Sequence, residues 1–142
     1  MGDITAANAV ITLTQATLFN TPVQLQDFAA DDVFDFDAIE NVEVVIGVDG
    51  VMSYGFVWKV QPQSITLQAG SASNDIMDLI QSSQQQANTA YPLNGIVLLP
   101  PIKKKIILTN GVLAHYKLPG AKKILTPRTY RITWNLAIPA PI

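Results

Sequence analysis

Residues 73–88, SNDIMDLIQSSQQQAN, carry the one clear helix signal in this chain, whose other segments have the pattern of strands and turns. The hydroxyl of Ser73 can accept one of the free N–H groups of the first helical turn. Asn88 suits the left-handed residue that often ends a helix, and Pro92 prevents any continuation. The sequence therefore predicts a helix over about residues 73–88.

This helix has one narrow apolar stripe and an opposite face rich in Gln and Ser. The stripe repeats at helical spacing and consists of Ile76, Leu79, Ile80, Ser83 and Ala87. A single helix with one apolar side needs a sheet to pack against. We therefore expect Leu79 and Ile80 to be buried against a sheet that the rest of the chain forms.

The remaining segments favour short strands separated by Gly, Pro and Asn-Gly turns. Residues 128–138 alternate and predict a long, half-buried central strand. Five of its side chains are expected to share one face: Tyr130, Ile132, Trp134, Leu136 and Ile138. The pair Asn110-Gly111 is typical of a type I′ turn, so residues 103–118 predict a hairpin. The predicted fold class is mainly β, an antiparallel β-sandwich or barrel of about eight strands with one flanking α-helix.

A second hairpin is predicted over residues 42–60, around an Asp-Gly turn at residues 47–50. Its first strand, residues 42–46, has the apolar, β-branched pattern of a buried strand. Gly55 is a possible bulge in the returning strand.

The returning strand of this hairpin places Tyr54, Phe56 and Trp58 on one face of the pleat. Two interpretations stay open. The face can be an ordinary core face, which the sequence favours, or the hairpin can project so that its aromatic side chains dock on a neighbouring molecule.

The composition indicates a protein that meets partners. The 142 residues suit one domain with a real core, and we expect residues 1–142 to form that domain. Only 14% of the residues are charged, against about 25% in an ordinary soluble domain, while 49% are hydrophobic. Other subunits are therefore expected to cover much of the surface.

Charge is distributed unevenly along the chain. All eleven acidic residues lie between Asp3 and Asp78, and eight of the nine basic residues lie between Lys103 and Arg131. Either the fold mixes the two halves and neutralises them locally, or an acidic and a basic surface meet when copies stack. Residues 28–40, which are acidic and aromatic together, are interpreted as a solvated or partner-facing loop. The candidate inter-subunit charge contacts are Asp31, Asp32, Asp35, Lys103, Lys104, Lys105, Lys122 and Lys123.

Signals for catalysis, cofactors and targeting are absent from the sequence. The chain has no cysteine, and its single histidine, His115, is interpreted as structural. The carboxylates of residues 31–40 do not have EF-hand spacing, and the run at residues 103–105 lacks the aromatic neighbours of a nucleic-acid groove. No signal peptide or membrane span is recognisable. We expect a soluble, cytoplasmically made protein that is not an enzyme, binds no cofactor or metal, and has no membrane anchor.

The order of elements resembles that of the tail tube proteins of tailed bacteriophages, especially contractile-tailed phages. The similar features are the Gly-x-Asp-Gly turn at residues 47–50, the Ser-Asn-Asp start of the helix, and the Tyr-Pro-Leu that follows it at residues 91–93. The aromatic-centred last strand also fits. The resemblance spans about residues 9–138, and the chain departs from it in its KKKIIL run and in the Pro-rich residues 138–142.

The resemblance implies a structural virion protein. Hexameric rings of identical subunits would stack into a hollow tube that conducts DNA into the host without sequence-specific binding. The sheets would line the lumen and the helix would lie outside. Sheath, baseplate and tail-terminator proteins would be partners, and the tail would assemble in the cytoplasm of the host bacterium. A hairpin centred on residues 48–55 would reach the adjacent ring, through Val48, Asp49, Gly50, Val51, Met52, Tyr54 and Phe56.

Other functions remain open at this stage. Within the same fold, the chain can be a tail-completion protein or a type VI secretion tube subunit. From another class, it can be a monomeric β-sandwich that binds carbohydrate or protein, which would need an aromatic groove. A hydrolase would need a pocket around His115.

Overall fold

The computed structural model describes residues 9–15, 17–19, 21–26, 28, 33–121 and 124–142. Within these, one antiparallel seven-stranded sheet has the order β2-β1-β7-β8-β9-β6-β3. Its strands are β1 Val10–Thr14, β2 Val23–Gln24, β3 Phe34–Phe36, β6 Gln61–Leu67, β7 Leu93–Leu99, β8 Lys104–His115 and β9 Arg128–Pro141. A separate hairpin is formed by β4 Val42–Ile46 and β5 Met52–Phe56. With the helix α1, Ser73–Ala87, the predicted mainly β class with one helix is confirmed.

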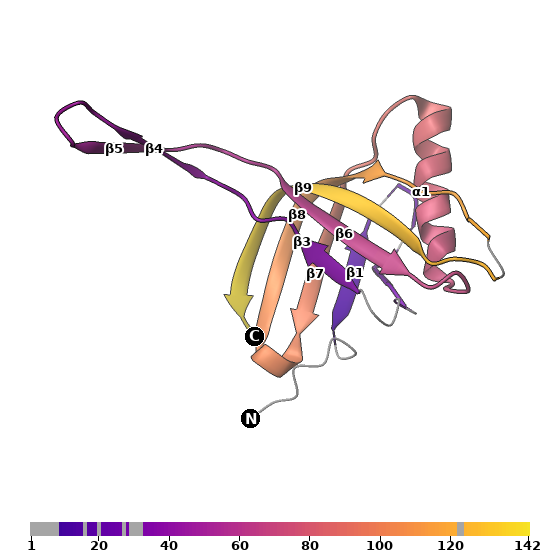
Figure 1. Cartoon of the computed structure of the whole chain (residues 1–142). Coiled ribbons are helices and arrows are strands. Elements are labelled where there is room, and N and C mark those ends of the chain that lie inside the picture. Colours follow the sequence, from indigo (N-terminus) through magenta and orange to yellow (C-terminus); the bar gives the residue numbers. More distant parts are fainter. Residues whose placement is uncertain (1–8, 16, 20, 27, 29–32, 122–123) are drawn as a thin grey trace.

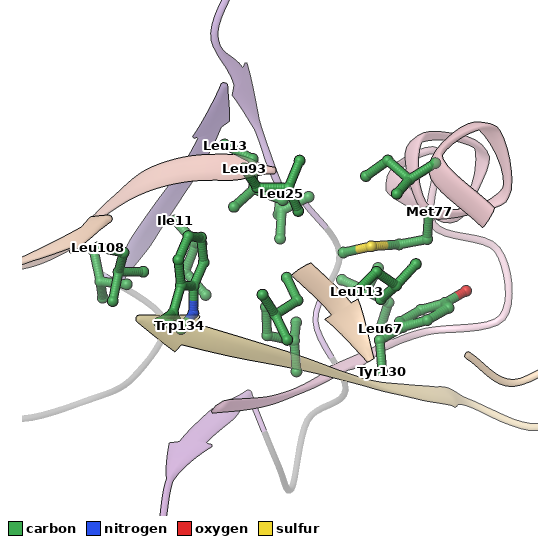
Figure 2. Packing of buried hydrophobic residues seen from close by; sticks show 14 residues of the cluster. Ile11, Leu13, Leu25, Leu67, Met77, Leu93, Leu108, Leu113, Tyr130 and Trp134 are labelled. Atoms are coloured by element: carbon green, nitrogen blue, oxygen red, sulfur yellow. The ribbon is translucent and has the colours of Figure 1, made fainter. Parts of the chain in front are cut away.

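The core lies in the curve of the seven-stranded sheet (Figure 1). Side chains from both halves of the sheet and from α1 meet there, as Figure 2 shows for Ile11, Leu67, Met77 and Trp134. Trp134 is fully buried, and its indole N–H donates to Oε1 of Gln63 at 2.9 Å. Burial of this set of large side chains is the main stabilising contribution to the fold.

The predicted helix exists, but it presents a different face to the sheet. Met77 and Ile80 are fully buried, whereas Leu79 is 41% exposed, so the expected burial of Leu79 is wrong. The helix is turned so that the row Ser73, Met77, Ile80 faces inward at spacings of four and three residues. The predicted end is confirmed, since Asn88 has the left-handed φ of 53°.

The start of α1 also differs from the prediction. The N-cap residue is Ala72, which has no side-chain capping hydrogen bond. The Ser73 hydroxyl instead accepts the N–H of Gln26 at 2.8 Å. Ser71 Oγ accepts the Ser73 N–H and donates to the Gln26 carbonyl. The two serines therefore fasten the start of the helix to the chain that follows β2.

The strand β9 is central, as predicted, because it lies between β8 and β6. Its first half buries Tyr130, Ile132 and Trp134. The expectation that Leu136 and Ile138 share this buried face is wrong, since both are exposed. The strand β6 begins with Gln61 opposite Trp134, so β9 has no β6 partner beyond this point, and there Ala137 packs on the core instead. The Pro-rich end of the chain continues β9 and pairs with β8.

The hairpin predicted around Asn110-Gly111 does not exist, because β8 runs through this pair without turning. Asn110 has a φ of 51°, and β8 has one extra residue relative to β7 between the pairs Leu93↔Gly111 and Gly95↔Leu108. The pair thus forms a bulge. Asn tolerates positive φ in a bulge as well as in a turn, which explains why the local signal misled.

The acidic and aromatic residues 28–40 are only partly a loop. Within the described residues they contain β3, an edge strand that pairs with β6. Phe34 and Phe36 pack against the core, and Asp35 between them is exposed. The interpretation of this whole segment as a loop is therefore wrong at β3, where alternate aromatic residues supply an apolar face.

Candidate interaction surfaces

The hairpin of β4 and β5 projects away from the main sheet as an arm, defined here as residues 42–56 (Figure 1). Its turn is the predicted one. Gly50 has a φ of 82°, the Val51 N–H donates to Asp49 Oδ1 at 3.1 Å, and the Gly47 N–H donates to the Val51 carbonyl at 2.9 Å. Only glycine adopts this φ without strain, so the Asp-Gly pair fixes the tip of the arm.

One face of the arm is entirely apolar. The register pairs three residues of β4 with three of β5, and directly paired residues project to the same face. These pairs are Val42↔Phe56, Val44↔Tyr54 and Ile46↔Met52. All six side chains are between 40% and 74% exposed. The opposite face carries Glu43, Val45, Ser53 and Gly55.

The expected burial of residues 42–46 is therefore wrong, and so is the preference for an ordinary core face around Tyr54. The projecting hairpin, the second interpretation of the sequence, is what the structure contains. Gly55 pairs with Glu43 in unbroken register, so it forms no bulge. A β-branched apolar strand has the same sequence pattern whether it is buried in its own core or exposed for a partner.

Sequence reasoning also missed the half of this apolar face that β4 supplies. A signal was available, because a tight Asp-Gly turn fixes the register of a hairpin. That register places Val42, Val44 and Ile46 beside the three recognised residues of β5.

The root of the arm is fastened to the main sheet. Arg131 Nη1 and Asp37 Oδ2 form an ion pair at 2.9 Å, and Gln61 Nε2 donates to the Asp37 carbonyl at 2.6 Å. The rings of Phe56 and Trp58 lie edge to face with centroids 5.0 Å apart. The two polar contacts join the chain just before the arm to β6 and β9, whereas the paired side chains of β4 and β5 stay exposed.

The basic run lies where β8 begins and β9 ends, away from the root of the arm. Lys103, with a φ of 53°, precedes β8, and Lys104 pairs with Pro141 at the end of β9. The arm leaves beside Gln61, which pairs with Trp134. Seven residues of β9 separate these two pairings, which is about 23 Å along an extended strand. None of Lys103, Lys104 and Lys105 forms an ion pair within the described part of the chain.

The other candidate charge contacts are only partly placed. Asp35 lies on the edge strand β3. Asp31, Asp32, Lys122 and Lys123 lie outside the described residues. The two ion pairs within the described residues, Asp37–Arg131 and Asp78–Arg128, both join the acidic half of the chain to the basic half. Local neutralisation thus accounts for part of the charge asymmetry but not for the lysine run.

A buried polar cluster fastens α1 to the sheet. The guanidinium of Arg128 is almost completely buried, and its Nη2 donates to Asp78 Oδ1 at 2.7 Å and to the Tyr116 hydroxyl at 2.9 Å. It also lies over the rings of Tyr116 and Tyr130, at 5.4 and 5.2 Å from their centroids. Tyr116 donates its own hydroxyl proton to Asp78. The Arg128 hydrogen bond lowers the pKa of Asp78, and burial raises the pKa of Tyr116.

This cluster has no catalytic geometry, because its groups satisfy one another and stabilise the helix. His115 lies at the exposed end of β8, opposite Arg131. Across the described ranges, no three His, Asp or Glu side chains are grouped to hold a metal ion. An open hollow of about 370 Å³ beside the end of α1 is lined by Gln81, Gln84, Gln85, Asn88, Thr89, Ala90, Val112 and Leu113. Among the residues that the structure describes, no helix has the length and apolar character needed to cross a membrane.

Comparison with known proteins gives one family and several similar folds. The family described as tail fiber protein gp32 matches residues 2–137. No curated protein matches the sequence. A chain in the extended sheath–tube complex of the extracellular contractile injection system PVC is 9% identical, with a TM-score of 0.64, and the alignment covers 99% of this chain and 93% of that one.

Two further structures come from the anti-feeding prophage. A chain in its baseplate is 9% identical, with a TM-score of 0.57, and the alignment covers 94% of this chain and 92% of that one. A chain in its tube-terminating cap is 8% identical, with a TM-score of 0.59 and coverage of 100% and 93%. At these identities the likeness shows a shared fold over whole chains of nearly equal length.

Proposed function

The chain belongs to the family described as tail fiber protein gp32, and from this premise we propose that it is a subunit of a phage tail tube. Membership in this family confirms the expected relationship to phage tail proteins and makes the chain a structural tail component. The family's description names a fibre, but the fold is that of a chain from a sheath–tube complex. This likeness over the full length of both chains supports the tube over the fibre.

The arm is the observation that carries the proposal. An isolated two-stranded hairpin is marginally stable in water, and this one exposes six large apolar side chains on a single face. Each such side chain favours burial by about 1.5–3 kcal/mol. A partner surface that covers this face therefore stabilises both the arm and the assembly. A subunit that reaches into the next layer of a tube has this construction.

In the proposed tube, the subunits form hexameric rings and the rings stack around a lumen through which DNA passes without sequence-specific binding. Val48, Asp49, Gly50 and Val51 lie at the tip of the arm that bridges successive rings. Sheath, baseplate and terminator proteins are the proposed partners, and the virion tail is the proposed location. In the proposed tube the helix α1 lies on the outside.

The likeness to a chain in a tube-terminating cap favours a second candidate, a tail-completion protein at the end of the tube. Such a protein forms a single ring, whereas a tube subunit forms many. A monomeric binding module is disfavoured, because it leaves the apolar face of the arm in water.

Electron microscopy of the purified protein at high concentration tests the proposal. A tube subunit gives stacked rings, and a completion protein gives single rings that do not lengthen as concentration rises. Replacing residues 48–55 with a two-residue turn should leave a folded subunit that no longer grows into tubes, with circular dichroism as the check on folding. Only monomers at every concentration, or long tubes from the shortened protein, would contradict the proposed role.

A further inference from the structure

We propose that the arm of one copy docks on a defined acceptor surface of a second copy, formed by an isoleucine row and by the lysine run where β8 begins and β9 ends. This inference rests on the proposed tube function and assigns the receiving side of the contact, which the arm alone leaves open.

The isoleucine row consists of Ile96, Ile107 and Ile138 on three adjacent strands. Ile96 pairs with Ile107, and Ile107 pairs with Ile138, so the three side chains stand in line on one face of β7, β8 and β9. They are 39–46% exposed, whereas their chain neighbours Val97 and Leu108 are buried. The row therefore lies on the face of the sheet opposite the core.

The lysine run borders this row. Lys105 lies two residues from Ile107 on β8 and so shares its face, beside Leu98 of β7. Lys104 projects to the opposite face of β8, and both Lys104 and Lys103 are exposed at the end of the strand. The strands β7, β8 and β9 contain no acidic residue. The acceptor surface is thus apolar with a positive border.

The arm has the complementary character. Its apolar face consists of the six side chains of the pairs Val42↔Phe56, Val44↔Tyr54 and Ile46↔Met52. This face can pack against the isoleucine row. Three acidic residues belong to the arm or lie beside it: Glu43 on its opposite face, Asp49 at its tip and Glu40 just before its first strand. Lys59 is the one basic residue between Glu40 and Gln61. Apolar contact with opposite charges around it is the arrangement that gives both affinity and register at an interface.

The two surfaces also have the placement that stacking requires. The arm leaves beside Trp134, at the middle of β9, and the lysine run lies where β8 begins and β9 ends, about 23 Å away along β9. Figure 1 shows the arm pointing away from the end of the sheet that carries the C-terminus. A copy therefore cannot satisfy its own acceptor surface. Because the arm and the acceptor surface of one chain are different, the contact between two copies is heterologous. Such a contact repeats from copy to copy and produces an open stack.

The decisive test separates donor from acceptor. One variant replaces residues 48–55 with a two-residue turn and cannot donate an arm. The other, Ile107→Glu, cannot accept one, because it places a carboxylate against the apolar and acidic arm. Each variant alone should form no tubes. Mixed together, they should form stacks of two layers only, since the intact arm of one fits the intact acceptor of the other. Leu79→Glu, a change at equal exposure on α1, is the matched control and should form tubes like the wild type.

Charge reversal tests the lysines separately. The double variant Lys104→Glu and Lys105→Glu should raise the critical concentration for tube growth by at least about tenfold. Adding Glu43→Lys and Asp49→Lys should restore growth. If the lysines instead contact nucleic acid, the double variant grows tubes normally and loses DNA binding, which overturns the acceptor assignment.

Different results contradict the tube function and the acceptor surface. Wild-type protein that forms neither rings nor tubes contradicts the tube function, and the acceptor assignment falls with it. Wild-type tubes together with normal tubes from Ile107→Glu contradict the acceptor assignment alone.

Discussion

Replacing Gly111 with Ala should destabilise the protein strongly, although glycine to alanine is the smallest change possible in a strand. A Cβ on Gly111 would lie 2.3 Å from Cε3 of Trp134, 2.6 Å from Cζ3 and 2.7 Å from Cδ2. The ordinary contact range begins at 3.4 Å, so the indole has to move by more than about 1 Å. Trp134 is fully buried.

The expected loss of stability in Gly111→Ala has two contributions. Overpacking of a filled core costs about 1–3 kcal/mol. The displaced indole also loses its 2.9 Å hydrogen bond to Gln63, which adds about 0.5–1.5 kcal/mol. A total of about 2–4 kcal/mol lowers the Tm by about 5–15 °C for a chain of this size.

Thermal unfolding followed by tryptophan fluorescence measures this effect. Trp58→Phe in every variant leaves Trp134 as the single reporter, because the chain has two tryptophans and Trp58 is exposed. Gly55→Ala is the matched control, since nothing lies within 4 Å of a Cβ there, and its Tm should stay unchanged. A Gly111→Ala protein that unfolds at the same temperature as Gly55→Ala would refute the packing of Trp134 against β8.

Three further outcomes follow from the same structure. Ile80→Ala should cost about 2–5 kcal/mol in chemical denaturation and Leu79→Ala less than about 1 kcal/mol, and equal costs would contradict the orientation of α1. The lowered pKa of Asp78 means that its ionised form stabilises the fold above about pH 4, and that this contribution is lost as pH falls through the folded-state pKa. In Asp78→Asn the free energy of unfolding should therefore fall less steeply as the pH is lowered below about 4. A fall as steep as in the wild type would show that the contact with Arg128 is not formed. Tube growth followed by light scattering should weaken as rising salt shortens the Debye length toward about 8 Å; growth that strengthens with salt would assign the contact to apolar burial alone.

The sequence predicted the elements whose signals are local. The end of α1 was predictable because Asn88 and Pro92 act on the backbone next to them. The central position of β9 was predictable because alternating Tyr130, Ile132 and Trp134 need cover on one face. Both features depend on residues within a few positions of the element itself.

The features that tertiary contacts decide were not predictable in this way. The rotation of α1 depends on Met77 filling the core and on Asn74, whose Oδ1 accepts the Tyr130 hydroxyl at 2.8 Å. The bulge at Asn110-Gly111 depends on Trp134, which lies in a different strand. In each case a local preference was compatible with two structures, and a distant side chain selected one of them.

The candidate interaction surfaces show the same limit. A run of apolar β-branched residues needs cover, and the sequence cannot state whether the cover comes from the same chain or from another copy. The isoleucine row is less visible still, because Ile96, Ile107 and Ile138 become neighbours only through the pairing of three strands. The low charge content and the high hydrophobic content were sequence signals that such exposed apolar surface exists.

Cryo-electron microscopy of assembled wild-type protein shows where the arm lies and so tests whether it joins successive rings. We expect β4 and β5 to cross from each ring into the next, with Tyr54 and Met52, both exposed in the single chain, covered by the neighbouring copy. Arms that fold back onto their own ring, or that hang free in the lumen while the rings stack without them, would contradict it.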